Sequence, residues 1–490
     1  MNFSKLKNHD WVITIVCILL MILGLIVIYS ATINATSSVT GAGTFSRQLI
    51  FIIVGLVFYF GISLIDISWI ENTSIIKILY VIIILLLIYV KFFGESIAGT
   101  NRWIDIGFFS LQPSEFGKIM IVILCAKIFA SYNDTKDIPI KSLKTSKKSM
   151  NLKKSPKYSF ILKIIKRFIN QEQTAYLKTL GINLLLISPI IFLTLIQPSL
   201  GNAVISFLIW LIIAVTLFPE QKKFLIFLSM GTLVISFYFM FLDINRIGSD
   251  LILSFRGWDY IDPWLIIVGL IVFAILVFSS RMKIINILII FTLFSGIFFS
   301  IFYGWNNILT NYQKTRVDTF LQGPESDPRG TGYQVIQSKI AIGSGMLTGR
   351  GFLQGSQSTL NILTQGFTDF VFATFAEQFG FVGSMLLLIL YLILILRIIK
   401  IAVESYNPFG KFLSLGVCLI LMLHVFINIG MNLGKLPVTG IPLPLMSYGG
   451  SSILMVMIAL GLVQSVNSSK KAVDIADNLM VTSRSLVIKT

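Results

Sequence analysis

Residues 11–29 read WVITIVCILLMILGLIVIY, a run without a single charged side chain. About 20 apolar residues are enough to cross the hydrocarbon core of a bilayer as one α-helix. Lys5 and Lys7 precede the run, as they would in a secretory signal, but no small-residue cleavage site follows it. We therefore expect a first membrane-spanning helix that the protein retains.

Comparable apolar runs recur from one end of the chain to the other. The 490 residues are 55% hydrophobic and only 12% charged, about half the charged share of a soluble protein. The composition predicts an all-α, polytopic transmembrane helix bundle with about 12 spans. The expected spans are 11–31, 48–66, 74–93, 113–131, 180–197, 201–218, 223–242, 263–280, 284–303, 369–397, 412–432 and 443–466.

The basic residues predict the orientation of the bundle. The formal net charge is +17, and the surplus lies in loops beside the helix ends, most of all in 132–178. Such loops stay on the cytoplasmic side. Counting spans from that loop, both termini are cytoplasmic, whereas 94–112, 305–368 and 433–442 face outward. This placement indicates contact with anionic membrane lipids and argues against nucleic acid as a partner.

These spans and loops divide the chain into six expected parts. One of these parts is the loop at 304–368, and a loop of that length is typical of a functional site rather than of a simple connection between helices. The parts are transmembrane helices in 1–131 with an outward motif loop at 94–112, a basic cytoplasmic loop at 132–178, further spans in 179–303, an extracellular loop at 304–368, C-terminal spans in 369–466, and a cytoplasmic tail at 467–490, of which we expect 472–490 to be flexible.

The few cysteines and histidines exclude two classes of site. Cys17, Cys125 and Cys418 all lie within apolar runs, His9 lies near the N-terminus, and His424 lies inside a span. This distribution gives neither a disulfide framework nor metal-ligand spacing. We expect no metal site built on histidine.

The first outward polar segment runs from Gly99 to Lys118 and contains Arg102-Trp103 and Gln112-Pro113-Ser114-Glu115. Pro113 suits the first turn of a helix, and Glu115 and Lys118 are three residues apart on one helix face. An unpaired charge at the membrane boundary is costly. Two interpretations remain open: a Glu–Lys pair that anchors the helix end, or a lysine that binds an anion.

The second polar segment is the long loop, which contains Asp327-Pro328-Arg329-Gly330. An Asp-Pro step among glycines by itself indicates only a turn. Cations on the same loop, Arg316 and Lys339 among them, favour chemistry at Asp327. The glycines of 343–355 permit tight backbone turns, but they do not match a phosphate-binding loop.

The third polar segment is 436–452, which reads LPVTGIPLPLMSYGGSS. Prolines and glycines at the start of a span are typical of a broken or re-entrant helix that lines a cavity, because the freed backbone groups need partners there. A kinked packing helix with small residues at its contacts explains the second half equally well.

Taken together, these segments resemble the SEDS (shape, elongation, division and sporulation) family of bacterial peptidoglycan polymerases. The motifs occur in the family's order and cover most of the chain. The matching stretches are Arg102-Trp103-Ile104, Gln112-Pro113-Ser114-Glu115, Asp327-Pro328, Gly332-Tyr333-Gln334, 337–345, Thr368-Asp369-Phe370, 437–444 and 447–452.

The stretches 428–431 and 438–444 look more like the elongation member of the family than the division member. Two stretches depart from the family's pattern. Ser199 stands where the family usually has an acid, and Thr364-Gln365-Gly366-Phe367 replaces a segment that commonly contains Glu and His. The family typically has ten spans, so the resemblance implies an inserted helical pair within about 223–303.

The resemblance implies polymerisation of lipid II at the outer face of the bacterial cytoplasmic membrane, with undecaprenyl pyrophosphate as the leaving group. Asp327 corresponds to the family's essential aspartate. The substrate-binding residues are then Arg102, Trp103, Gln112, Glu115, Lys118, Arg316, Lys339, Ser447 and Tyr448. A divalent cation would suit a pyrophosphate substrate, although no ligand cluster is visible in the sequence. The implied partners are a class B penicillin-binding protein and other membrane proteins of the elongation complex.

Three alternative functions remain. A flippase or transporter for lipid-linked precursors would also use broken helices and intramembrane charges. A non-catalytic scaffold of the cell-wall machinery would tolerate the loss of Asp327. A division or sporulation paralogue would share the chemistry but not the role in elongation.

Overall fold

The structure is a computed structural model in which the chain forms two compact units, Met1–Ile213 with Asp327–Thr490, and Ala214–Ser326. It describes residues 9–33, 43–97, 100–105, 107, 110–136, 171–197, 199–216, 311–359, 362–363 and 365–487.

Long apolar helices dominate the described residues and confirm an all-α integral membrane protein. Seven helices in this part of the chain are long and apolar enough to cross a bilayer. They are α1 (Trp11–Thr32), α2 (Thr44–Ser63), α4 (Thr73–Phe93), the Thr179–Ile196 part of α7 (Gln171–Ile196), α15 (Val371–Glu404), α16 (Pro408–Asn432) and the Gly450–Ser469 part of α17 (Gly450–Val487).

Two further expected spans are present as helices, α5 (Pro113–Lys136) and α8 (Leu200–Thr216), whose apolar part, Leu200–Ala214, is shorter. The spans expected at 223–242, 263–280 and 284–303 lie outside the described residues. The predicted inserted pair lies there too. The described part of the second unit is mainly the helix α12 (Asn311–Gln322) and one 3-10 turn, Pro324–Ser326.

Burial separates an inner helix from outer ones. In the membrane-spanning part of α17, 94% of the residues are buried, whereas in that of α4 the buried share is 17%. The inner helix packs against α2, and α16 packs against α5 and α15. An apolar helix that leaves most of its surface uncovered by protein faces lipid in a membrane. The central helix therefore organises the bundle, while α4 lines its rim.

Helix α15 is bent at Gly380, where the backbone has φ 66° and ψ −163°. A left-handed φ suits glycine, which has no Cβ to clash. The bend frees backbone N–H groups, and two of them find new acceptors. The amide of Phe381 donates to the carbonyl of Met346 at 2.8 Å, and that of Val382 donates to Leu347 at 3.0 Å. The loop after α13 thus completes the hydrogen bonding of a broken helix.

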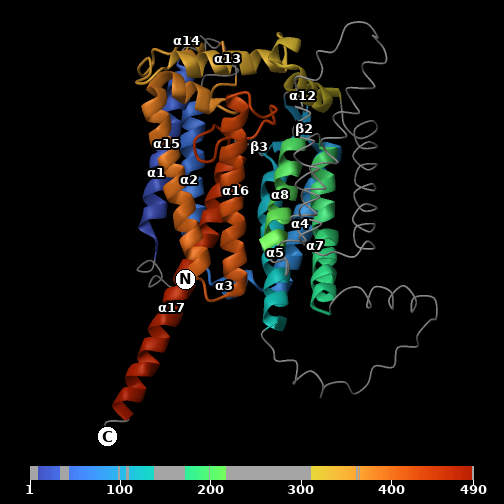
Figure 1. The fold of residues 1–490 in the computed structure, drawn as a ribbon, viewed down its shortest axis with the longest axis vertical. Coiled ribbons are helices and arrows are strands. Elements are labelled where there is room, and N and C mark those ends of the chain that lie inside the picture. Colours follow the sequence, from blue (N-terminus) through green and yellow to red (C-terminus); the bar gives the residue numbers. More distant parts are fainter. Residues whose placement is uncertain are drawn as a thin grey trace, which may run out of the picture. The chain divides into compact units, whose positions relative to one another are not determined.

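A polar layer covers one end of the bundle. Helices α13 (Thr331–Ser344) and α14 (Ser356–Thr359) lie across the ends of α15 and α16 (Figure 1). A small antiparallel sheet precedes α5 and consists of β1 (Glu95–Ile97), β2 (Thr100–Asp105) and β3 (Ser110–Leu111). In this sheet Ile104 pairs with Leu111, and Asp105 pairs with Ser110.

The C-terminal segment differs from the flexible tail that the sequence suggested. Helix α17 continues without interruption to Val487 and runs beyond the lower ends of its neighbours (Figure 1). After Gly461 the sequence contains no further glycine or proline, so nothing breaks the helix at the expected boundary of 467.

Candidate active site

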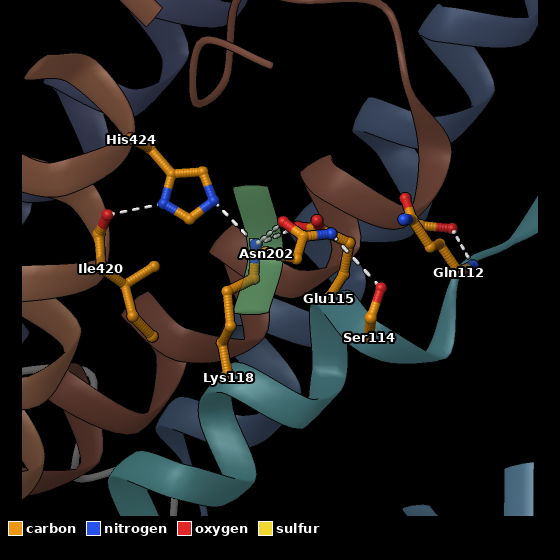
Figure 2. A network of polar contacts seen from close by, with 8 residues as sticks. Gln112, Ser114, Glu115, Lys118, Asn202, Ile420 and His424 are labelled. Carbon is orange, nitrogen blue, oxygen red and sulfur yellow. Dashed lines mark hydrogen bonds and ion pairs between the residues drawn. The ribbon is translucent and has the colours of Figure 1, made fainter. Parts of the chain in front are cut away.

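A buried ionic cluster joins three helices near the start of α5. Lys118 is completely buried, and its Nζ donates to Glu115 Oε2 at 2.9 Å, to Asn202 Oδ1 at 3.1 Å and to His424 Nε2 at 2.8 Å (Figure 2). An ammonium group has three N–H donors. All three have acceptors here, so the charge of Lys118 is fully coordinated by protein.

The partners of Lys118 are themselves held in place. His424 Nδ1 lies 2.7 Å from the carbonyl of Ile420, so the ring donates there and accepts from Lys118 through Nε2. Asn202 Nδ2 donates to Ser114 Oγ at 3.3 Å. This geometry favours the first interpretation of the Glu–Lys pair, in which it anchors helices. Direct contact between Lys118 and an anion requires the lysine to leave these partners.

Sequence reasoning did not predict the roles of His424 and Asn202. The signal was nonetheless present, because an ionisable residue inside a membrane span is expensive and needs a partner. What the sequence did not contain was the partner's identity, since Lys118 and His424 are 306 positions apart.

The start of α5 is tied to the central helix through Gln112. Its backbone N–H donates to Ser451 Oγ at 2.9 Å, and that hydroxyl donates to the carbonyl of Ser110 at 2.8 Å. Arg102 and Trp103, the other predicted residues of this segment, are half-buried on β2. The short sheet and the α5 entry therefore bring four of the predicted residues, Gln112, Glu115, Arg102 and Trp103, into one connected region.

Three consecutive carbonyls before α15 are fixed by the third polar segment and by α16. The carbonyl of Phe367 accepts from the amide of Tyr448 at 2.9 Å, and that of Thr368 accepts from Ser447 Oγ at 2.6 Å. The carbonyl of Asp369 accepts from Asn428 Nδ2 at 2.8 Å. The segment 436–449 is irregular, as predicted, and protein groups accept from or donate to Ser447, Tyr448 and Gly449 within it.

Asn432 acts as a hub between three elements. It is completely buried, donates to the carbonyl of Asp369 at 3.2 Å, and accepts from the amide of Ala373 at 3.1 Å. Its own carbonyl accepts from Ser338 Oγ on α13 at 2.8 Å. The amide side chain and backbone of this one residue thereby connect α13, α15 and α16.

The half-buried Asp327 lies in the turn that leads into α13. The amide of Gly330 lies 3.3 Å from the carbonyl of Asp327, and the carboxylate covers Gly330 so closely that a Cβ there would collide with both of its oxygens. The carboxylate therefore lies at the start of a 14-residue helix, where the partial positive charge of the helix dipole favours an anion.

Lys339 follows on the same helix and is exposed, with its Cε against Gly434. Asp327 and Lys339 thus belong to the layer that Asn432 holds. Arg316 lies on α12, in the other unit. Within the described residues, no group of three or more His, Cys, Asp or Glu side chains could hold a metal ion.

Comparison with known proteins identifies relatives along nearly the whole chain. Peptidoglycan glycosyltransferase MrdB of Escherichia coli (strain K12) is 33% identical over 454 residues, which cover 92% of this chain and 93% of the relative. Peptidoglycan glycosyltransferase RodA of Treponema pallidum (strain Nichols) is 29% identical over 479 residues, covering 96% and 99% of the two chains.

The fold is also shared with a solved structure. One chain of a peptidoglycan synthase complex that coordinates polymerization and crosslinking superposes with a TM-score of 0.53 at 23% identity, covering 94% of this chain and 98% of that one. The FtsW/RodA/SpoVE family model, described as cell cycle protein, matches residues 10–257 and 264–472. The chain therefore belongs to the FtsW/RodA/SpoVE family.

Proposed function

We propose that this protein is a peptidoglycan glycosyltransferase that polymerises lipid II into glycan strands for cell elongation. One observation carries the proposal: a relative named as a peptidoglycan glycosyltransferase is 33% identical over 92% of the chain. The family model matches residues 264–472, a range that contains Asp327 and the polar layer, and this supports placing the reaction there.

Asp327 is the proposed general base. A sugar hydroxyl of one substrate attacks the anomeric carbon of a lipid-linked chain, the bond from that carbon to the pyrophosphate oxygen breaks, and undecaprenyl pyrophosphate leaves. A hydroxyl is a weak nucleophile, so a carboxylate that takes its proton accelerates the step by about 10²–10⁴. A half-buried position in a short turn suits this task, because the carboxylate is held yet reachable.

Cations near the pyrophosphate would stabilise the charge that develops as it leaves. Arg102 and Lys339 suit direct contact, since the first is only half-buried and the second is exposed. Arg316 remains a candidate on its own unit. Lys118 is positioned by its ion pair with Glu115, and the lysine acts on the anion directly only if the cluster opens. A bound metal ion has no fitting group of ligands among the described residues, so no step is assigned to one.

The remaining predicted residues would shape the substrate site. Trp103 and Tyr448 offer aromatic surface, and both are half-buried. Gln112 and Ser447 fix the entry to α5 and the irregular segment 436–449 through the hydrogen bonds described above. In this proposal they hold the walls of the site rather than react.

The chemistry requires the layer with Asp327 to face outward. The basic loop 132–178 supports this sidedness, with both termini in the cytoplasm. We also propose a class B penicillin-binding protein as partner. The similarity to a chain of a peptidoglycan synthase complex that coordinates polymerization and crosslinking supports that proposal. Other membrane proteins of the elongation complex are proposed as further partners.

Purified protein mixed with lipid II in detergent tests the proposal, with products separated by size. Asp327→Asn should lower the polymerisation rate by about 10²–10⁴ while leaving the melting temperature unchanged. Glu325→Gln is the matched control, because this exposed acid lies two residues away, and its rate should equal that of the wild type. Detergent offers no two compartments, so glycan synthesis there excludes a purely transporting role. Full activity in Asp327→Asn removes that residue from the role of base, and no synthesis by the wild type rejects the proposed function.

A further inference from the structure

Four large apolar side chains are exposed on the loop that follows α13. Met346, Leu347, Phe352 and Leu353, together called the apolar tip, are 80%, 66%, 43% and 37% exposed. Scattered exposed hydrophobics are ordinary, but a contiguous group of them marks a surface that something apolar covers. The sequence suggested only tight turns for this loop.

The backbone that presents the apolar tip is held firmly. Besides the bonds from Phe381 and Val382, the amide of Arg350 donates to the carbonyl of Glu377 at 2.9 Å, and the amide of Gly351 donates to Gln378 at 3.1 Å. Met346 and Leu353 have φ of 45° and 65°. Positive φ is uncommon for such residues and persists only where the surroundings impose it. The exposure is therefore imposed by the fold.

The side chain of Glu377 also forms hydrogen bonds with residues at the end of this loop. This buried carboxylate accepts through Oε1 from the amide of Gln357 at 2.8 Å and from Ser356 Oγ at 3.3 Å. Arg350 Nη1 donates to the same serine hydroxyl at 2.9 Å. Both ends of the loop are thus attached to α15, on either side of the apolar tip.

The apolar tip continues the lipid-facing surface of α15. Phe381 and Val382, which bond to the tip's carbonyls, are 57% and 53% exposed, and Leu386 and Ile389 extend the exposed stripe along the helix. The stripe approaches Lys400 at its other end. From Phe381 to Lys400 the helix advances about 30 Å, the thickness of the hydrocarbon core. Phe381 and the tip beside it therefore lie at the opposite boundary of that core.

Aromatic side chains give an independent measure of depth. Phe352 of the tip stacks on Tyr29, with ring centroids 6.5 Å apart, and Tyr29 packs edge-on against Phe45 at 5.7 Å. Tyr29 lies near the end of α1, and Phe45 lies at the start of α2. Tyrosine and tryptophan collect where a membrane meets water, so Tyr29 marks that level. The length of α15 from Lys400 to Phe381 and the contact of Phe352 with Tyr29 both place the tip at the boundary of the hydrocarbon core.

We propose that the apolar tip is inserted into the lipid leaflet at the α13 end of the bundle, where its side chains contact acyl chains just below the headgroups. Lipid is the occupant because the four side chains of the tip are apolar and continuous with a membrane-facing helix surface, while the exposed Thr348 and Arg350 between them suit the headgroup region. Insertion fixes the depth of the loop and of α13, and so holds Asp327 at headgroup level. The proposal does not depend on the glycosyltransferase activity.

A fluorescent probe in vesicles tests this placement. Leu347→Cys is labelled with an environment-sensitive nitrobenzoxadiazole dye in full-length protein reconstituted into phosphatidylcholine and phosphatidylglycerol vesicles. The three native cysteines are buried, which favours selective labelling. Lys435→Cys is the water-facing control, because it is exposed just after α16, and Ile389→Cys is the lipid-facing control.

The expected result is that nitroxide-labelled lipids quench the dye at 347 as they do at 389, whereas iodide quenches only the dye at 435. Iodide quenching at 347 equal to that at 435 would overturn the proposal, because the tip would then lie in water. A dye at 347 shielded from both quenchers would overturn it as well, because protein rather than lipid would cover the tip. Neither outcome affects the glycan synthesis assay, so this proposal and the proposed function fail separately.

Discussion

Two polar regions hold this bundle together, and they do so by different means. The cluster around Lys118 joins α5, α8 and α16 through charges that are fully buried. The layer around Asn432 joins α13, α15 and α16 through neutral amides and backbone carbonyls. A buried charge is costly to leave without its partner, whereas a neutral amide costs less. A single substitution in the first region should therefore lower the free energy of unfolding more than a single substitution in the second.

The largest effect should come from removing one charge of the ionic cluster. Lys118→Met leaves the Glu115 carboxylate buried without its cation, so we expect the free energy of unfolding to fall by about 3–5 kcal/mol. Thermal unfolding in detergent measures the loss. The double variant Glu115→Gln/Lys118→Met should recover much of it, because no uncompensated charge remains. If Lys118→Met melts like the wild type, Lys118 is not buried in the folded protein, and direct anion binding becomes the better interpretation.

A smaller loss should follow when the neutral hub is altered. Asn432→Leu removes the hydrogen bond to the carbonyl of Asp369 and the one from the amide of Ala373, and the loss of two buried hydrogen bonds should lower stability by about 1–3 kcal/mol. Ser338→Ala is the graded control, because it removes only one hydroxyl, whose main hydrogen bond at 2.8 Å to the Asn432 carbonyl is worth about 0.5–1.5 kcal/mol. Equal losses in the two variants would show that the amide does not have the hub role assigned to it.

The two regions also differ in how much of them the sequence predicted. Apolar runs predicted the membrane bundle, since this pattern is local, whereas the orientation inferred from the basic loops stays a prediction. The spacing of Glu115 and Lys118 gave their ion pair as one of two open interpretations, and the structure contains that pair. His424, Asn202 and the Asn432 hub required knowledge of which helices pack together, and no local pattern carries that information. The helical continuation of α17 was not predicted, although its residues after Gly461 contain no glycine or proline that would break a helix.

The glycine-rich loop after α13 differs from both polar regions, because close contact between its backbone and that of α15 holds it in place. Gly349 has φ 83°, and a Cβ there would collide with the carbonyl of Gln378. Gly349→Ala should therefore destabilise the protein by about 1–2 kcal/mol, which a denaturation curve in detergent would measure. The change should also release the apolar tip, so the dye at 347 should become more accessible to iodide. Unchanged stability would mean that the loop does not pack against α15 as described.

Gly343 provides the smallest expected effect, with the opposite sign. It lies near the end of α13 in the same loop region, its φ is not positive, and a Cβ there would meet no atom within 4 Å. Alanine is the better helix former, so Gly343→Ala should raise the free energy of unfolding by roughly 0.5–1 kcal/mol. The same denaturation measurement serves both variants. Because the two glycines are six residues apart, opposite signs would show that the loop needs glycine only where its backbone closely approaches α15. A loss at 343 similar to that at 349 would instead indicate that α13 itself is not helical at its end.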